Sequence, residues 1–149
     1  MPSVVSDELQ RIMAAFLEAV SFEPGSAPTY ARIRELFIPA GLLIKNSGAA
    51  PEISSVGGFI TPRQALVDSG ALTEFEEVEV GAITEAFGNV AHRASTYEKR
   101  GIQDGVSFQA RGVIFTQFIA TPDGWKMTVM AWDDERPGLD LPDRYRSAP

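Results

Sequence analysis

The strongest constraint on the fold is a change of hydrophobic period after Gly70. From there four long segments show strand-like alternation, over residues 74–87, 90–100, 106–121 and 125–134. Turn residues at hairpin spacing separate them: a Gly-Asn pair, a five-residue stretch that begins and ends with Gly, and a Pro-Asp-Gly triplet. Four consecutive strands with short connections predict an antiparallel meander.

The residues before this point follow a helical period instead. Residues 7–20 predict an amphipathic helix with Ser6 as its N-cap. Its apolar face is formed by Leu9, Ile12, Met13, Phe16 and Val20. A shorter helix is predicted to begin at Pro28, which suits a first helical position, and to stop before Pro39.

Three short elements are predicted between the helices and the meander. Residues 41–45 and 53–60 are apolar enough for short strands, the second weakened by two glycines. Thr61 and Pro62 then predict the start of a helix that runs to about Asp68. Helices followed by a run of strands indicate an α+β fold, a curved antiparallel sheet packed on N-terminal helices. We expect a single domain over residues 1–136, and a loosely ordered tail over 137–149 because Pro, Asp and Arg dominate there.

Composition excludes several classes of function. The formal net charge of -7 disfavours binding to nucleic acid or to an anionic membrane surface. There is no cysteine and only one histidine, so thiol chemistry and a multi-histidine metal site within one chain are excluded, and neither a metal nor a cofactor is predicted. No apolar stretch approaches the ~20 residues that span a bilayer, and no leader-like start is visible, so a cytoplasmic location is expected.

The two faces of the predicted sheet are both rich in apolar residues. In the 106–121 strand one face is almost wholly apolar, and the other mixes Val and Phe with Gln and Arg. A sheet with one solvated face would show one clean polar face. Since one helical layer covers only one face, we expect a second copy of the chain to cover the other and form a homodimer.

The end of the meander resembles the nuclear transport factor 2-like (NTF2-like) superfamily, which includes ketosteroid isomerases, SnoaL-like polyketide cyclases and the kinase association domain. The resemblance is carried by residues 123–127 (DGWKM) leading to 131–133 (AWD), and by the strand from Val90 to Glu98. It implies a cone-shaped fold with an internal pocket, and it makes the outer sheet face a dimer interface. The isomerase's catalytic set is not matched in order and spacing.

Matching the strand faces to this family implies that the mixed faces point into the pocket. The predicted site residues on those faces are His92, Thr96, Glu98, Arg111, Phe115, Gln117, Met130 and Trp132, with Tyr30 added from the helical side. Such an apolar pocket with a few polar groups is typical of a small-molecule site.

Two candidates for catalysis stand out, each with a structural alternative. His92 is the side chain that titrates near neutral pH and so could act as a general acid or base, or it could be a solvated or structurally hydrogen-bonded histidine. Glu98 lies across the predicted hairpin from Arg111. The pair could move a proton and orient a polar substrate, or it could be a cross-strand ion pair that only holds register.

Two functions therefore remain open from the sequence. The first is an isomerase, cyclase or dehydratase that acts by proton transfer on a small, mostly apolar molecule. The alternative is a non-catalytic module, either a small-ligand-binding protein or a dimeric scaffold.

Overall fold

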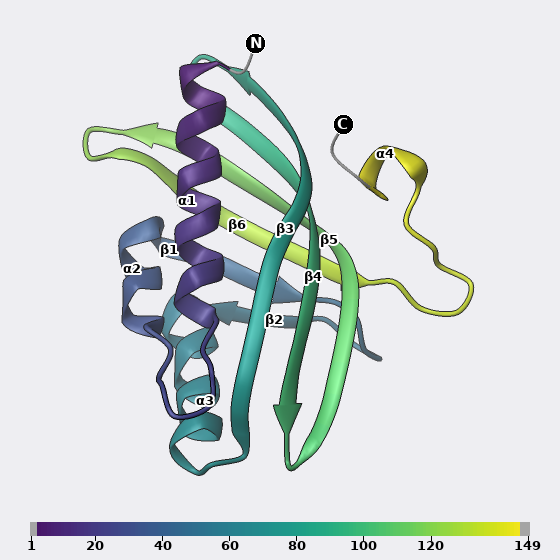
Figure 1. The fold of residues 1–149 in the computed structure, drawn as a ribbon. Coiled ribbons are helices and arrows are strands. Elements are labelled where there is room, and N and C mark those ends of the chain that lie inside the picture. Colours follow the sequence, from purple (N-terminus) through teal and green to yellow (C-terminus); the bar gives the residue numbers. More distant parts are fainter. Residues whose placement is uncertain (1–2, 147–149) are drawn as a thin grey trace.

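The computed structural model describes residues 3–146 and has one six-stranded sheet with helices packed on one face (Figure 1). The strands lie in the order β2-β1-β6-β5-β4-β3. They are β1 (Phe37–Lys45), β2 (Glu52–Ser55), β3 (Leu72–Phe87), β4 (Val90–Gln103), β5 (Val106–Thr121) and β6 (Gly124–Asp134). The helices are α1 (Val4–Val20), η1 (Tyr30–Arg32), α2 (Ile33–Leu36), α3 (Val56–Asp68) and α4 (Asp143–Arg146).

The predicted meander is confirmed. Strands β3 to β6 pair in sequence order and antiparallel, with turns at the predicted glycines. The sheet is not wholly antiparallel, because β1 pairs in parallel with β6 and carries β2 on its other edge. The long strands curve around α1, as Figure 1 shows, and the face that α1 covers is called the inner face from here on.

Helix α1 begins earlier than predicted. Its N-cap is Ser3, whose hydroxyl oxygen accepts a hydrogen bond from the Ser6 N–H at 3.0 Å, so Ser6 is not the cap. Val5 extends the apolar face by one turn and packs on the core. None of the helices within residues 3–146 is long and apolar enough to cross a membrane.

Helix α3 also begins earlier, at Val56, with Ser55 as its N-cap and Pro62 inside it. The Ser55 hydroxyl accepts from the Gly58 N–H at 3.0 Å, and this cap lets the helix start through two glycines that favour neither helix nor strand. Burial of Val56 and Phe59 fixes the first turn against the core. The strand predicted over 53–60 is accordingly shorter.

Part of the tail expected to be loosely ordered makes defined contacts on the outer face, the face opposite α1. Leu141 is buried, and its N–H donates to the Glu135 carboxylate at 2.9 Å. Helix α4 lies across the sheet from α1 in Figure 1, and the Tyr145 carbonyl accepts a hydrogen bond from the Thr96 hydroxyl. The chain itself therefore covers part of the face that the sequence assigned to a second copy. Residues 147–149 lie outside the described residues.

Packing on the inner face is very close where the Tyr97 side chain of β4 crosses Gly112 of β5. A Cβ atom at Gly112 would lie 2.1 Å from the Asp133 carbonyl oxygen and 2.5 Å from the Tyr97 hydroxyl. Replacing Gly112 by Ala is expected to lower the free energy of unfolding by about 3 kcal/mol, because neither neighbour can move without breaking the sheet. Urea denaturation measures the change.

Gly48→Ala is the control for this substitution, because nothing lies within 4 Å of a Cβ atom built there. Its free energy of unfolding should match the parent protein or exceed it slightly. Equal stabilities for the two variants would contradict the close packing at Gly112.

Candidate functional site

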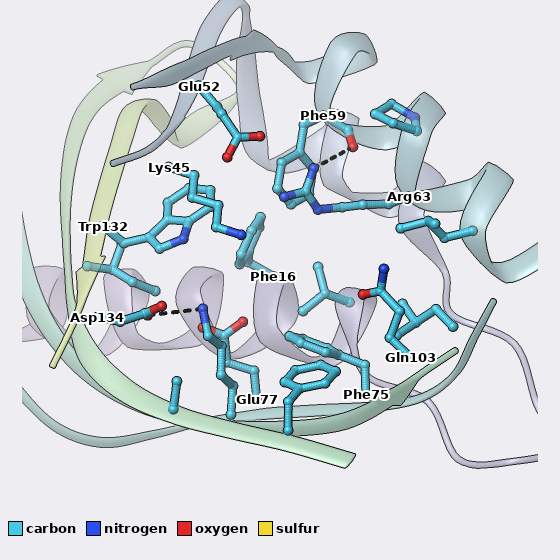
Figure 2. A pocket seen from close by; sticks show the side chains of 18 of the residues that line it. Phe16, Lys45, Glu52, Phe59, Arg63, Phe75, Glu77, Gln103, Trp132 and Asp134 are labelled. Atoms are coloured by element: carbon cyan, nitrogen blue, oxygen red, sulfur yellow. Dashed lines mark hydrogen bonds and ion pairs between the residues drawn. The ribbon is translucent and has the colours of Figure 1, made fainter. Parts of the chain in front are cut away.

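A cavity of about 580 Å³ lies between the inner face of the sheet, α1 and α3 (Figure 2). Its volume is in the range typical of small-molecule sites. Six aromatic side chains from six different elements line it: Phe16, Tyr30, Phe59, Phe75, Phe108 and Trp132. The cavity therefore offers both aromatic and polar surface to a ligand.

The aromatic wall is held by contacts between rings, one of them edge-on and the others tilted. Phe59 packs edge-on against Trp132 with ring centroids 6.2 Å apart, and lies 6.1 Å from Phe16. Phe75 and Phe108 pack against each other at 6.2 Å on the sheet side. Because α1, α3 and three strands contribute these rings, the wall depends on the whole tertiary fold.

The polar floor of the cavity consists of Glu77, Lys99 and Asp134. Glu77 of β3 lies directly opposite Lys99 of β4 in the sheet register. The Lys99 Nζ is 3.1 Å from the Asp134 carboxylate, the ion pair drawn in Figure 2. This contact reaches across β5 because that strand presents only small residues between them, Ala110 and Gly112.

Burial raises the pKa of the Glu77 carboxyl to about 7. Lys99 and Arg63 oppose this shift and the Asp134 carboxylate adds to it, but the loss of solvation is the largest cause. The backbone N–H of Glu77 donates to Ser21 at the end of α1, which fixes its place on β3. A carboxyl group that is half ionised near neutral pH can both donate and accept a proton.

Tyr97 holds one residue of this floor, Asp134, in place by a hydrogen bond. Its fully buried hydroxyl donates to the Asp134 carboxylate and lies 3.0 Å from the Asp133 carbonyl oxygen. Burial, together with the hydrogen bond to Asp134, raises the pKa of Tyr97 far above its usual value, so it stays protonated. Tyr97 thereby orients Asp134 toward Lys99.

The side of the cavity opposite this floor carries Arg63 of α3, Lys45 of β1 and Glu52 of β2. The Arg63 guanidinium lies over the Phe59 ring, with its central carbon 3.6 Å from the ring centroid. Burial lowers the pKa of the Arg63 guanidinium and raises the pKa of the nearby Tyr30 hydroxyl.

Three predicted site residues line the cavity. Tyr30 reaches it from η1, and Met130 and Trp132 reach it from β6. The other predicted residues belong to β4 and β5 and lie on the outer face, so the predicted orientation of those two strands is wrong.

His92 is exposed on the outer face and its Nε2 lies 2.7 Å from a Glu85 carboxylate oxygen. Gln117 sits opposite it on β5. Neither residue is among those that line the cavity. The geometry matches the alternative in which His92 is a hydrogen-bonded surface histidine.

Glu98 and Arg111 are direct cross-strand partners, as predicted, but on the outer face. Arg111 forms its ion pair with Glu135 at 2.7 Å. Thr96 is buried under the tail, and Phe115 packs edge-on against the Tyr145 ring at 6.1 Å. These four residues therefore lie on the outer face of the sheet, where the tail buries Thr96.

The faces of β4 and β5 are exchanged relative to the prediction, and this exchange has a physical cause. The almost wholly apolar face of β5 packs on α1 and the core, whereas the mixed face is at the surface. The sequence contained this signal, because the more apolar face of a central strand is the one that buries most surface against helices. The sequence did not single out Glu77, because β3 carries Glu residues on both of its faces. Lys99 and Asp134, which contact the same part of the cavity, were not predicted as site residues either.

Within residues 3–146, no group of three or more His, Asp or Glu side chains is arranged to hold a metal ion. The groups that the cavity does present include a titratable carboxyl, an ammonium–carboxylate pair and a stacked guanidinium.

Several solved structures have a fold similar to this one. An NTF2-like superfamily protein from Salmonella enterica superposes with a TM-score of 0.73 over 90% of this chain and 93% of its own, at 12% identity. This chain has the NTF2-like fold. An NTF2-like protein from Prochlorococcus superposes with a TM-score of 0.67 at 18% identity, over 90% of this chain and 95% of its own.

A third NTF2-like structure has a provisional name that states an activity. It is a protein from Streptomyces avermitilis named provisionally as a dehydratase, with a TM-score of 0.65 at 16% identity over 91% of this chain and 99% of its own. No protein-family model and no curated protein sequence matches the chain. At these identities the likeness establishes the fold, and function must be argued from the cavity.

The raised pKa of Glu77 predicts a pH-dependent stability. Below pH 4.5 the carboxyl is protonated in both states; as pH rises toward 7 it ionises only in the unfolded chain, which favours unfolding. Replacing Glu77 by Gln removes this dependence. The variant should gain about 3 kcal/mol relative to the parent between pH 4.5 and pH 8, measured by urea denaturation at several pH values.

Glu76→Gln is the matched control, because Glu76 is the next residue on β3 and is exposed beside Arg100. Its difference from the parent should not change with pH over the same range. A Glu77→Gln profile parallel to that of the parent would show that Glu77 is not desolvated.

Proposed function

We propose that this protein is a proton-transfer enzyme, of the isomerase, cyclase or dehydratase type, that acts on a small and mostly apolar molecule. The observation that carries the proposal is Glu77, a carboxyl with a pKa of about 7 facing an aromatic-lined cavity. A general base or acid works best when its pKa is near the working pH. Glu77 takes the role that the sequence suggested for His92.

The neighbours of Glu77 suit a carbonyl substrate. The Lys99 side chain can donate a hydrogen bond to a carbonyl oxygen, and its ion pair with Asp134 holds it in place. Glu77 as carboxylate would take a proton from the adjacent carbon and return it to another position, while Lys99 stabilises the enolate oxygen formed between the two steps. Tyr97 acts as a positioning residue, through Asp134.

The apolar wall favours such chemistry. Phe16, Phe59 and Trp132 limit water around the floor, and an environment with less water strengthens the interaction between Lys99 and a developing negative charge. The dehydratase name of the Streptomyces avermitilis structure agrees with this reaction class and says nothing about this chain's substrate. Binding without catalysis is the alternative that the experiment must separate.

Proton transfer is tested by hydrogen–deuterium exchange at carbon. The protein is incubated in D₂O with a panel of small cyclic ketones and enones, and loss of the α-proton signal is followed by NMR. The parent should accelerate exchange, and the rate should rise with pH through about 7 as Glu77 ionises. Glu77→Gln should reduce the rate at least 100-fold, because the catalytic base is removed.

Glu98→Gln is the matched control, since it makes the same chemical change on the outer face. It should keep the parent rate within about two-fold, because the Glu98 side chain lies on the outer face and does not line the cavity. Exchange that Glu77→Gln leaves intact would overturn the proposed role. Exchange with no ketone of the panel would favour the non-catalytic, ligand-binding alternative.

We also infer that the protein forms a homodimer through the outer face of the sheet. Val78 and Ile83 of β3 are 44% and 41% exposed there, and Phe115 of β5, on the other side of β4, is 55% exposed, although all three are large apolar residues. An exposed apolar patch on a sheet favours association with another surface. The tail covers only part of this face, beside Thr96 and Phe115.

Sedimentation velocity at micromolar concentration tests the dimer. Ile83→Asp should convert a dimer to a monomer, because a charge without a partner would be buried in the interface. Val4→Asp is the control, since Val4 is an exposed apolar residue on α1, away from the outer face. A parent protein that sediments as a monomer, or an Ile83→Asp dimer, would contradict the inference.

A further inference from the structure

Arg63 is held rigidly at one side of the cavity. Its guanidinium carbon lies 3.6 Å from the centre of the Phe59 ring, and its Nη1 donates to the Phe59 carbonyl oxygen at 3.1 Å. Figure 2 shows the guanidinium stacked on that ring at the edge of the cavity. Since a guanidinium has five N–H donors, most of them remain for another partner.

No carboxylate among residues 3–146 lies within 4.0 Å of the Arg63 guanidinium. Other arginines of the sheet do have such partners: Arg93 pairs with Glu79 at 2.6 Å and Arg111 with Glu135 at 2.7 Å. Arg63 is partly buried, and burial lowers its pKa. The Glu52 and Glu77 carboxyl groups act against this lowering without pairing with the guanidinium, so its charge is only partly compensated.

The cavity has one more cation than carboxylates when Glu77 holds its proton, and equal numbers when Glu77 is ionised. It is lined by three cations, Lys45, Arg63 and Lys99, and by three carboxyl groups, Glu52, Glu77 and Asp134. Lys99 and Asp134 neutralise each other as an ion pair. When Glu77 holds its proton, the two cations on the α3 side face a single carboxylate, that of Glu52.

We infer that the substrate is a small carboxylic acid with an apolar body, and that Arg63 binds its carboxylate. This inference rests on the proposed function, in which the same cavity is the substrate site. A planar guanidinium fits a carboxylate with two parallel hydrogen bonds, and stacking on Phe59 presents its edge ready for that contact.

The rest of the cavity is arranged to complement such a molecule. Phe59 and Trp132 adjoin Arg63 and would contact the apolar body. Glu77 and Lys99 lie on the sheet side of the same cavity, so an acid anchored at Arg63 would extend its other end toward them. Arg63 is therefore a specificity-determining residue, and Glu77 carries the chemistry.

Binding of matched acids and amides tests this inference without any turnover. The probes are benzoate, phenylacetate, 3-phenylpropionate and 1-naphthoate, each paired with its neutral primary amide, titrated by calorimetry at low salt. At least one acid should bind the parent protein at least 10-fold more tightly than its amide, because only the acid forms charge-assisted hydrogen bonds. Equal affinities for every pair would overturn the inference.

Two substitutions assign the preference to Arg63. Arg63→Gln should reduce the preference for the acid to less than two-fold and leave amide affinity unchanged, whereas Arg63→Lys should keep part of it. Arg11→Gln, on the exposed surface of α1, is the matched control and should behave as the parent. An acid preference that survives in Arg63→Gln would overturn the assignment.

The two proposals can fail separately. Acid-selective binding that depends on Arg63 supports the inference even when no ketone exchanges its proton, a result that would reject only the proposed catalysis. Conversely, Glu77-dependent exchange together with equal affinities for acids and amides would reject the carboxylate site and leave the proton-transfer function standing.

Discussion

The arrangement of the cavity depends on one close contact, that of Tyr97 with Gly112. Because Gly112 has no side chain, the Tyr97 ring can cross β5 and its hydroxyl can reach Asp133 and Asp134 of β6. This contact ties together the three strands β4, β5 and β6. The Asp134 carboxylate is thereby fixed for its ion pair with Lys99, and these two groups define the floor of the cavity.

The Asp134 carboxylate held by this contact also acts on Glu77. Loss of solvation is the main reason that the pKa of Glu77 rises to about 7, and the charge of Asp134 adds to the rise. The adjacent Lys99 limits the rise but is largely committed to Asp134. Glu77 is a carboxyl group that is costly to ionise, and the ammonium beside it is already paired with another carboxylate. Such an arrangement reduces the stability of the fold and is common at functional sites.

Much of the fold follows from local pattern, because turn residues and hydrophobic period act over short distances. The meander, the amphipathic α1 and the α+β class were all predictable in this way. The residues at which helices and strands begin and end were less predictable from the sequence. Helix α3 starts through two glycines because Ser55 caps it and Phe59 is buried, and that burial exists only after the core has formed.

The sequence by itself determined approximately which residues lie in each long strand. It did not determine the register shifts between Glu79 and Gly81 of β3 and between Met127 and Val129 of β6, which change the residues that share a face. Only the tertiary structure decided which face is inner, since alternation in a strand has the same period on both sides. In β5 both faces carry large apolar residues, so the choice depends on packing against α1 and under the tail. That packing turns Glu77, Lys99 and Arg63 into the cavity and leaves His92 and Glu98 at the surface.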